Sequence, residues 1–248
     1  MRIEFPCDGL RLVGELVEAS PETKRAHLVV LCHGIPSGSP PVAGDGGYPA
    51  LARRISALGF DTVHFNFRGT GDSEGDFELP GWSRDIGALL DFLQDLRGEC
   101  LAAVVGFSGG GAVAVHRAVE DKRIAGLVLG AAPAEFRFLG YDSAGEAMVQ
   151  FFRGIGVIRN PEFPRSLEEW QAGFDETAPE RLIGRLAGRP MLILHGTQDD
   201  MVPPEHARRL AAAAGDGAEM AIIEGAGHRL RLYEPAVQRI EAWLSKNL

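Results

Sequence analysis

The chain alternates short apolar runs with amphipathic segments, and this alternation constrains its fold more than any other feature of its sequence. Residues 26–32 (AHLVVLC) form one such run, which is typical of a strand buried on both faces. Strands that alternate with helices build a mostly parallel sheet with helices packed on both sides. With 248 residues, the chain is long enough to enclose a large core of this kind. We therefore predict an α/β fold.

The predicted elements run through almost the whole chain. Extended runs predict strands at 2–6, 10–18, 26–32, 61–67, 101–107, 124–132, 190–195 and 219–224. Helical patterns predict helices at 49–58, 81–96, 109–120, 203–214 and 233–247. The step from Asp8 to Gly9 indicates a hairpin between the first two strands. Residues 35–48, which are rich in Gly and Pro, predict a loop.

Residues 134–189 break this rhythm, because they are irregular and rich in aromatic side chains. One interpretation is an elaborate crossover with one or two ordinary helices. The other is a small lid whose exposed aromatic side chains line a pocket, and we favour it because such residues on an insertion are easiest to explain over a site. The prediction is a core of residues 1–133 and 190–248, with a cap at 134–189.

Composition excludes several classes of partner. The formal charge of −9 disfavours nucleic acid and anionic membrane surfaces, which repel an acidic protein. No apolar run approaches the roughly 20 residues that span a bilayer, and the N-terminal residues do not resemble a signal peptide. Three widely spaced cysteines suggest reduced thiols, with Cys32 as a small buried apolar residue. We expect a cytoplasmic protein.

A single serine stands among glycines in residues 106–110 (GFSGG), between a predicted strand and a predicted helix. The pattern Gly-x-Ser-x-Gly at such a junction holds its serine in a strained turn, above the carboxyl ends of the strands. Gly106 and Gly110 would avoid collisions with the neighbouring strand and helix, and the helix start offers unpaired N–H groups to an oxyanion. The simpler interpretation is a plain turn in which Ser108 caps the helix.

A nucleophilic serine needs a base, and the chain has seven histidines. His228 stands out because it lies in a glycine-rich loop, residues 225–228 (GAGH), directly after the last predicted strand. A surface-loop histidine is the alternative interpretation. His33 and His195 each close a predicted strand and fit packing or loop-orienting roles, and His206 lies in a helix that looks exposed.

The base needs an acid to orient it, and residues 192–204 (LILHGTQDDMVPP) supply two candidates beyond the penultimate strand. Asp199 is the favoured one and Asp200 is its rival. Either could instead cap the helix that follows Pro203. The end of the preceding strand, residues 130–133 (GAAP), offers no carboxylate until Glu135, so an acid after the penultimate strand is the better-placed choice.

These residues together resemble the α/β-hydrolase superfamily, in which the chain order is also Ser, then Asp, then His. The resemblance covers nearly the whole chain from Leu28 to the final helix. It is carried by four motifs, at residues 33–36 (HGIP), 106–110 (GFSGG), 195–203 (HGTQDDMVP) and 225–228 (GAGH). In the family's His-Gly-x-x-Asp-x-x-Val-Pro pattern, the aspartate corresponds to Asp199, and Asp200 takes a variable position.

The resemblance implies an α/β-hydrolase fold with a small helical lid, and it implies roles for residues. Ser108 would be the nucleophile, His228 the base and Asp199 the acid. The backbone N–H groups of Ile35 and Gly109 would form the oxyanion hole, since Pro36 has no N–H to offer. Residues 67–75 (FRGTGDSEG) look like the family's Arg-Gly-x-Gly-x-Ser loop, in which Arg68 and Asp72 would brace the turn.

The function that we predict is a serine hydrolase, a carboxylesterase acting on a small to medium apolar acyl group through an acyl-enzyme. A thioesterase or a peptidase or amidase on the same triad is the alternative, and a non-catalytic ligand-binding member of the fold is a third. We expect no cofactor and no metal. The expected partner is a small-molecule ester, with no nucleic acid and no membrane, in a monomer or homodimer.

Overall fold

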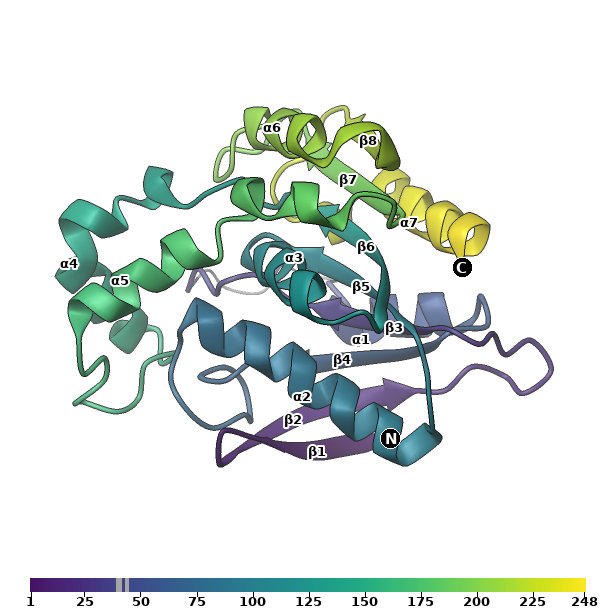
Figure 1. The fold of residues 1–248 in the computed structure, drawn as a ribbon, viewed down its shortest axis with the longest axis horizontal. Coiled ribbons are helices and arrows are strands. Elements are labelled where there is room, and N and C mark those ends of the chain that lie inside the picture. The colour runs from purple at the N-terminus through teal and green to yellow at the C-terminus, as the bar shows by residue number, and fades with distance from the viewer. Residues whose placement is uncertain (39–41, 43–44) are drawn as a thin grey trace.

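The computed structural model describes residues 1–38, 42 and 45–248, and within them eight strands form one sheet (Figure 1). The strand order is β1-β2-β4-β3-β5-β6-β7-β8. The first two strands and β4 pair antiparallel, and every pairing from β4 to β8 is parallel. The strands are β1 Arg2–Cys7, β2 Leu10–Val17, β3 Leu28–Cys32, β4 Asp61–Asn66, β5 Ala102–Phe107, β6 Ile124–Gly130, β7 Met191–Gly196 and β8 Ala218–Ile223.

Seven α-helices accompany the sheet in the described part of the chain. They are α1 Gly47–Ser56, α2 Leu79–Arg97, α3 Gly109–Glu120, α4 Tyr141–Gly154, α5 Leu167–Glu176, α6 Glu205–Ala214 and α7 Glu234–Asn247. Short 3₁₀ turns lie at Arg137–Leu139, Pro179–Arg181, Ile183–Leu186, Gly215–Gly217 and Leu230–Leu232. All predicted strands and helices are confirmed to within two residues at each end.

Two connections were predicted, the hairpin at Asp8 and Gly9 and the loop at 35–48. The hairpin at Asp8 and Gly9 is confirmed, and both residues have positive φ (51° and 78°), as a tight turn between twisted strands requires. Of the predicted loop at 35–48, residues 39–41 and 43–44 lie outside the described residues. Its last two residues begin α1.

Two apolar layers explain why the central strands lack the alternation of a half-exposed strand. All residues of β3, β5 and β7 are buried, because successive side chains point into opposite layers. In β3, Val30 packs in the layer under α2, α3 and α6, whereas Val29 and Leu31 pack in the layer under α1 and α7. The predicted mostly parallel sheet with helices on both faces is confirmed.

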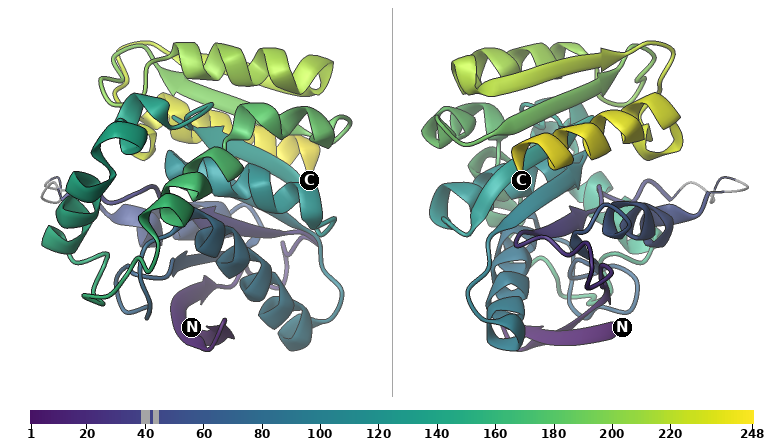
Figure 2. Two further views of the ribbon diagram at one scale, coloured as in Figure 1. Left: turned by 60° about the vertical axis from the view of Figure 1, so that its left-hand side comes forward. Right: turned by 90° about the vertical axis from the view of Figure 1, so that its right-hand side faces the viewer.

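Residues 134–189 leave the sheet after β6 and return at β7, and they contain α4 and α5. These helices stand to one side of the sheet in two different views (Figures 1 and 2). Most of the aromatic side chains in this segment are buried, contrary to the expectation that they are exposed. Trp170 and Phe174 pack around Phe77 of the core, and the Trp170 indole N–H donates to the Phe77 carbonyl at 2.9 Å. The buried aromatic side chains of this segment therefore belong to the same apolar layer as the core under α2, α3 and α6.

No helix in the described part of the chain is both long enough and apolar enough to cross a bilayer.

A buried cation holds the turn after β4, where Arg68 was predicted to act as a brace. The Arg68 guanidinium donates to the Asp85 carboxylate of α2 at 2.7 Å, and both side chains are almost fully buried. It also donates to Asp8 in the first hairpin at 2.8 Å and to Glu78 before α2 at 3.1 Å. Asp72, predicted as a second brace, is exposed and pairs with Arg2 instead.

We expect the substitution Arg68→Met to lower the free energy of unfolding by about 3–5 kcal/mol, because it leaves Asp85 as a buried charge without its partner. Arg2→Met, the control, removes an exposed pair and should change stability by less than about 1 kcal/mol. Urea unfolding followed by tryptophan fluorescence measures both. Equal losses in the two variants would contradict a structural role for the buried pair.

Candidate functional site

Ser108 lies at a sharp turn between β5 and α3, with backbone angles φ 51° and ψ −128°. A positive φ is uncommon for a residue with a side chain, and neighbouring glycines make the turn possible. A Cβ on Gly106 would lie 2.5 Å from the Gly111 Cα, and one on Gly110 would lie 2.3 Å from the His33 carbonyl oxygen. The predicted reason for these two glycines, avoidance of helix and strand, is confirmed.

The His33-Gly34-Ile35 segment after β3 lies directly beside this turn. A Cβ on Gly34 would stand 2.8 Å from the Ser108 Cβ and 3.4 Å from its Oγ, so only glycine fits. A Cβ on Gly109 would stand 2.8 Å from the Ile35 Cγ1 and 3.6 Å from its backbone nitrogen. The structure thus brings the backbone of Ile35 close to Gly109, so the two predicted oxyanion-hole donors lie near each other and next to Ser108.

His33 holds the carbonyl of Gly34. Its Nδ1 lies 2.8 Å from that oxygen, and because a carbonyl only accepts, Nδ1 carries the proton. Its Nε2 then accepts the Phe67 N–H at 3.3 Å, and it lies 3.1 Å from the Thr70 hydroxyl, which donates to the Phe67 carbonyl at 2.7 Å. Burial lowers the pKa of His33 to about 4, so the ring is neutral near pH 7. Since Gly34 C=O and Ile35 N–H belong to one peptide unit, His33 also orients the N–H of Ile35.

Asp199 and His228 are in direct contact. The His228 Nδ1 lies 2.8 Å from the Asp199 Oδ2 and 3.1 Å from its Oδ1, so Nδ1–H faces the carboxylate and Nε2 faces away from it. The Asp199 Oδ1 also accepts the backbone N–H groups of Met201 at 3.0 Å and Val202 at 2.8 Å. A carboxylate held in this way fixes the tautomer and the orientation of the imidazole.

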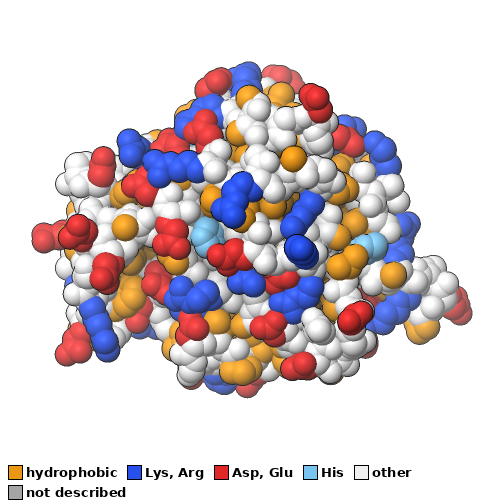
Figure 3. All heavy atoms as spheres, in the orientation of Figure 1, with side chains coloured by type: hydrophobic (Ala, Val, Ile, Leu, Met, Phe, Trp, Pro, Cys, Tyr) orange, Lys and Arg blue, Asp and Glu red, His pale blue; other side chains and the backbone are white. Residues whose placement is uncertain are grey.

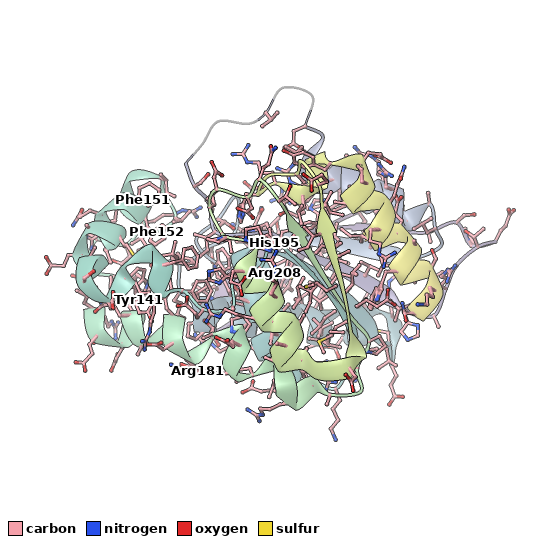
Figure 4. All side chains as sticks on the ribbon, turned by 90° about the horizontal axis from the view of Figure 1, so that it is seen from above. Tyr141, Phe151, Phe152, Arg181, His195 and Arg208 are labelled. Carbon is pink, nitrogen blue, oxygen red and sulfur yellow. The ribbon has the colours of Figure 1, made fainter. Side chains whose placement is uncertain are left out.

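A second histidine, His195, supports the same carboxylate from beneath the site. Its Nε2 lies 2.7 Å from the Val202 carbonyl, which only accepts, and 3.1 Å from the Asp199 Oδ2. The side chain is fully buried, and Figure 4 shows it within the body of the protein. Burial acts to raise the pKa of Asp199, but the hydrogen bonds from His195, His228 and the Val202 N–H outweigh it and hold that pKa below its ordinary value.

Asp200 and His206 are the two other residues of this region for which the sequence made a prediction. Asp200, the rival acid, is exposed, and the described hydrogen bonds of His228 go to Asp199. The prediction that His206 is exposed is wrong, because its side chain is buried and its Nδ1 accepts the Ala134 N–H at 3.0 Å. The sequence of α6 gave no sign that the start of residues 134–189 packs on this helix and covers His206.

Ser108 and His228 together line two adjoining cavities. One measures about 400 Å³ and is walled by apolar side chains of the cap, with Phe138 and Phe151 among them. Figure 4 shows Phe151 on α4, at the side of the molecule away from the sheet. The other cavity measures about 440 Å³ and is more polar, with Arg229 and Arg231 in its wall. The site can therefore receive a molecule with two chemically different halves.

A sequence model described as the alpha/beta hydrolase family matches residues 29–240 of the chain. The chain belongs to the alpha/beta hydrolase family. The match extends from β3 to α7 and includes Ser108, Asp199 and His228, and the predicted α/β-hydrolase fold is confirmed. This alpha/beta hydrolase also has relatives and structural neighbours.

One relative is the uncharacterized protein Rv2307c of Mycobacterium tuberculosis, which is 28% identical over 228 residues, covering 89% of this chain and 69% of the relative. The monoacylglycerol lipase of Paleococcus ferrophilus has a similar structure, with a TM-score of 0.69 at 21% identity, covering 96% of this chain and 99% of that one. An esterase domain from a Rhodothermus marinus protein has a TM-score of 0.71 at 19% identity, covering 99% and 98%. At these identities the structural likeness concerns the fold.

In the described part of this alpha/beta hydrolase, no three His, Cys, Asp or Glu side chains gather into a group that could hold a metal ion.

We expect Asp199 to make stability depend on pH. Because its folded-state pKa lies below the unfolded value of about 3.9, its carboxylate stabilises the fold fully above that value and loses this effect as pH falls further. The gap in unfolding free energy between wild type and Asp199→Asn should therefore be larger at pH 7 than at pH 2.5. Urea titrations at both pH values measure it.

Asp200→Asn is the matched control, because its side chain is exposed and should leave the gap near zero at both pH values. A gap for Asp199→Asn that stays the same at pH 2.5 would contradict the stabilising role of this carboxylate.

Proposed function

We propose that this alpha/beta hydrolase cleaves a carboxylic ester with a small to medium apolar acyl group through Ser108, His228 and Asp199. The observation that carries the proposal is the His228 imidazole, which lies 2.8 Å from Asp199 and lines the same cavity as a serine held at positive φ. Membership of the alpha/beta hydrolase family supports a hydrolase. One structural neighbour is described as a lipase and another as an esterase domain, which supports an ester as the substrate.

The hydrogen bonds between His228 Nδ1 and Asp199 support the following chemistry. His228 Nε2 takes the Ser108 proton while Oγ attacks the ester carbonyl, and the tetrahedral intermediate then expels the alcohol, which receives that proton. Water repeats the sequence on the acyl-enzyme and releases the acid. Asp199 keeps Nδ1 protonated and stabilises the positive charge that the imidazole gains in each step.

The developing oxyanion is where we expect backbone donors to contribute most. The proximity of the Ile35 and Gly109 backbones to Ser108 supports them as donors, and the α3 N-terminus would add unpaired N–H groups and the positive end of its dipole. Loss of one oxyanion-hole donor typically costs about 10²–10³ in turnover. His33 acts here as a positioning residue, since it holds the peptide unit that carries the Ile35 N–H.

We expect wild type to hydrolyse p-nitrophenyl esters between acetate and palmitate and Ser108→Ala to lose about 10⁴-fold or more in kcat/KM. Ser245→Ala, on the exposed face of α7, is the control and should retain full activity. A fluorophosphonate probe should label wild type and not Ser108→Ala. Absence of any serine-dependent rate on esters, with labelling intact, would move the proposal to thioesters or amides, and absence of labelling would sink it.

The apolar cavity should set the preference for acyl chain length. Met148 of α4 lines that cavity, so Met148→Trp fills part of it and should lower kcat/KM at least tenfold for the longest chains that wild type accepts. Met220→Trp on β8 lies outside it and serves as the matched control. If both variants retain the wild-type chain-length profile, the acyl group binds elsewhere.

A further inference from the structure

The second cavity beside Ser108 has a different character from the apolar one. It measures about 440 Å³ and is walled by the loop that follows His228, by the His33 segment and by Tyr48. Two arginines, Arg229 and Arg231, and one aspartate, Asp45, contribute to its wall. The apolar acyl pocket lacks such groups in its described lining.

Arg231 already has its partners. It forms an ion pair with Asp45 at 2.5 Å, and its guanidinium lies 5.4 Å from the centre of the Tyr48 ring. Asp45 also accepts the Gly47 N–H at 2.8 Å. The charges of Arg231 and Asp45 therefore neutralise each other, and the pair forms a fixed part of the cavity wall.

Arg229 is different, because no carboxylate among the described residues lies within ion-pair distance of it, and no described hydrogen bond uses its side chain. It is partly buried and directly follows His228. One carboxylate faces two guanidinium groups, so the cavity has an uncompensated positive charge in a chain whose formal charge is −9. Figure 3 shows the more usual arrangement, with basic side chains next to acidic ones on the face that it draws.

The positive charge of Arg229 lies next to the proposed catalytic base, His228. His228 gives its proton to the leaving oxygen, and Arg229 and Arg231 lie on the same loop, beyond His228. The apolar half of a bound ester occupies the cap side of Ser108, which leaves the polar cavity for the alcohol half. A guanidinium without a partner binds carboxylate or phosphate through short, charge-assisted hydrogen bonds.

We propose that the alcohol half of the substrate carries an anionic group, a carboxylate or a phosphate, and that Arg229 recognises it. This inference rests on the proposed ester hydrolysis, and it names the chemical class of the leaving group. Arg229 is a specificity-determining residue in this scheme, and the Arg231–Asp45 pair shapes the wall against which the anion lies.

Matched ester pairs test the proposal. O-butyrylglycolate and its neutral amide, butyryloxyacetamide, form the carboxylate pair, and monobutyryl glycerol 3-phosphate and monobutyrin form the phosphate pair. Rates are followed by proton release at constant pH. Wild type should favour the anionic member of at least one pair by roughly tenfold or more in kcat/KM, and the pair that shows the preference identifies the anion.

In Arg229→Gln the ratio of anionic to neutral kcat/KM should fall to about one, and Arg229→Lys should retain part of the preference. Arg239→Gln on α7 removes the same charge far along the surface and should retain all of it. No preference in wild type, an unchanged ratio in Arg229→Gln, or an equal fall in Arg239→Gln would each overturn the proposal.

A binding measurement distinguishes failure of the proposed ester hydrolysis from failure of the proposed anion site. If wild type cleaves none of these esters and no p-nitrophenyl ester, calorimetric titration of the Ser108→Ala variant with glycolate and with glycerol 3-phosphate measures the anion site alone. Binding that Arg229→Gln weakens tenfold or more would support the site without the reaction. Absence of binding to both anions would overturn it.

Discussion

The contact between the start of α3 and the end of β3 is the constraint on which the site depends. The His33 carbonyl oxygen occupies the space that a side chain on Gly110 would need, at 2.3 Å from the position of its Cβ. This approach places the His33-Gly34-Ile35 segment beside Ser108, and it requires the strained turn at that serine. A larger residue at Gly110 would separate the two elements and move the Ile35 N–H away from the nucleophile.

Polar groups within the structure are held in chains of hydrogen bonds that begin in the interior and end at the cavity. Asp199 has partners on both oxygens, and one of them, His195, is itself fixed by a backbone carbonyl. His33 has partners on both ring nitrogens. Burial makes an unpaired polar group costly, so these chains leave few alternative orientations for the groups that face the substrate.

Much of this arrangement could be predicted from the sequence, because local signals sufficed. The strands buried on both faces are continuous apolar runs, and the glycines around Ser108 mark a tight turn wherever they occur. The contact between Asp199 and His228 followed from their places after neighbouring strands, whose carboxyl ends meet at one edge of a sheet. The roles of Ser108, Asp199, His228, Ile35 and Gly109 in catalysis stay predictions.

Other features could not be predicted, since they depend on contacts between distant segments. The aromatic residues of the cap gave no sign of which would pack against Phe77 and which would face the cavity. His206 looked exposed because its partners come from a distant segment: it accepts the N–H of Ala134, 72 positions earlier in the chain, and the Phe138 ring packs against it. The pair of Arg231 and Asp45 joins residues 186 positions apart, so Arg229 could not be distinguished from its neighbour as the cation without a partner.

The buried state of His33 has a consequence for the pH–rate profile of the proposed hydrolase. Two imidazoles serve the proposed reaction, His228 as the base and His33 as the support of an oxyanion donor. With its pKa near 4, His33 keeps one protonation state from mildly acidic to alkaline solution. A change of rate with pH above about pH 5 therefore has its origin outside His33.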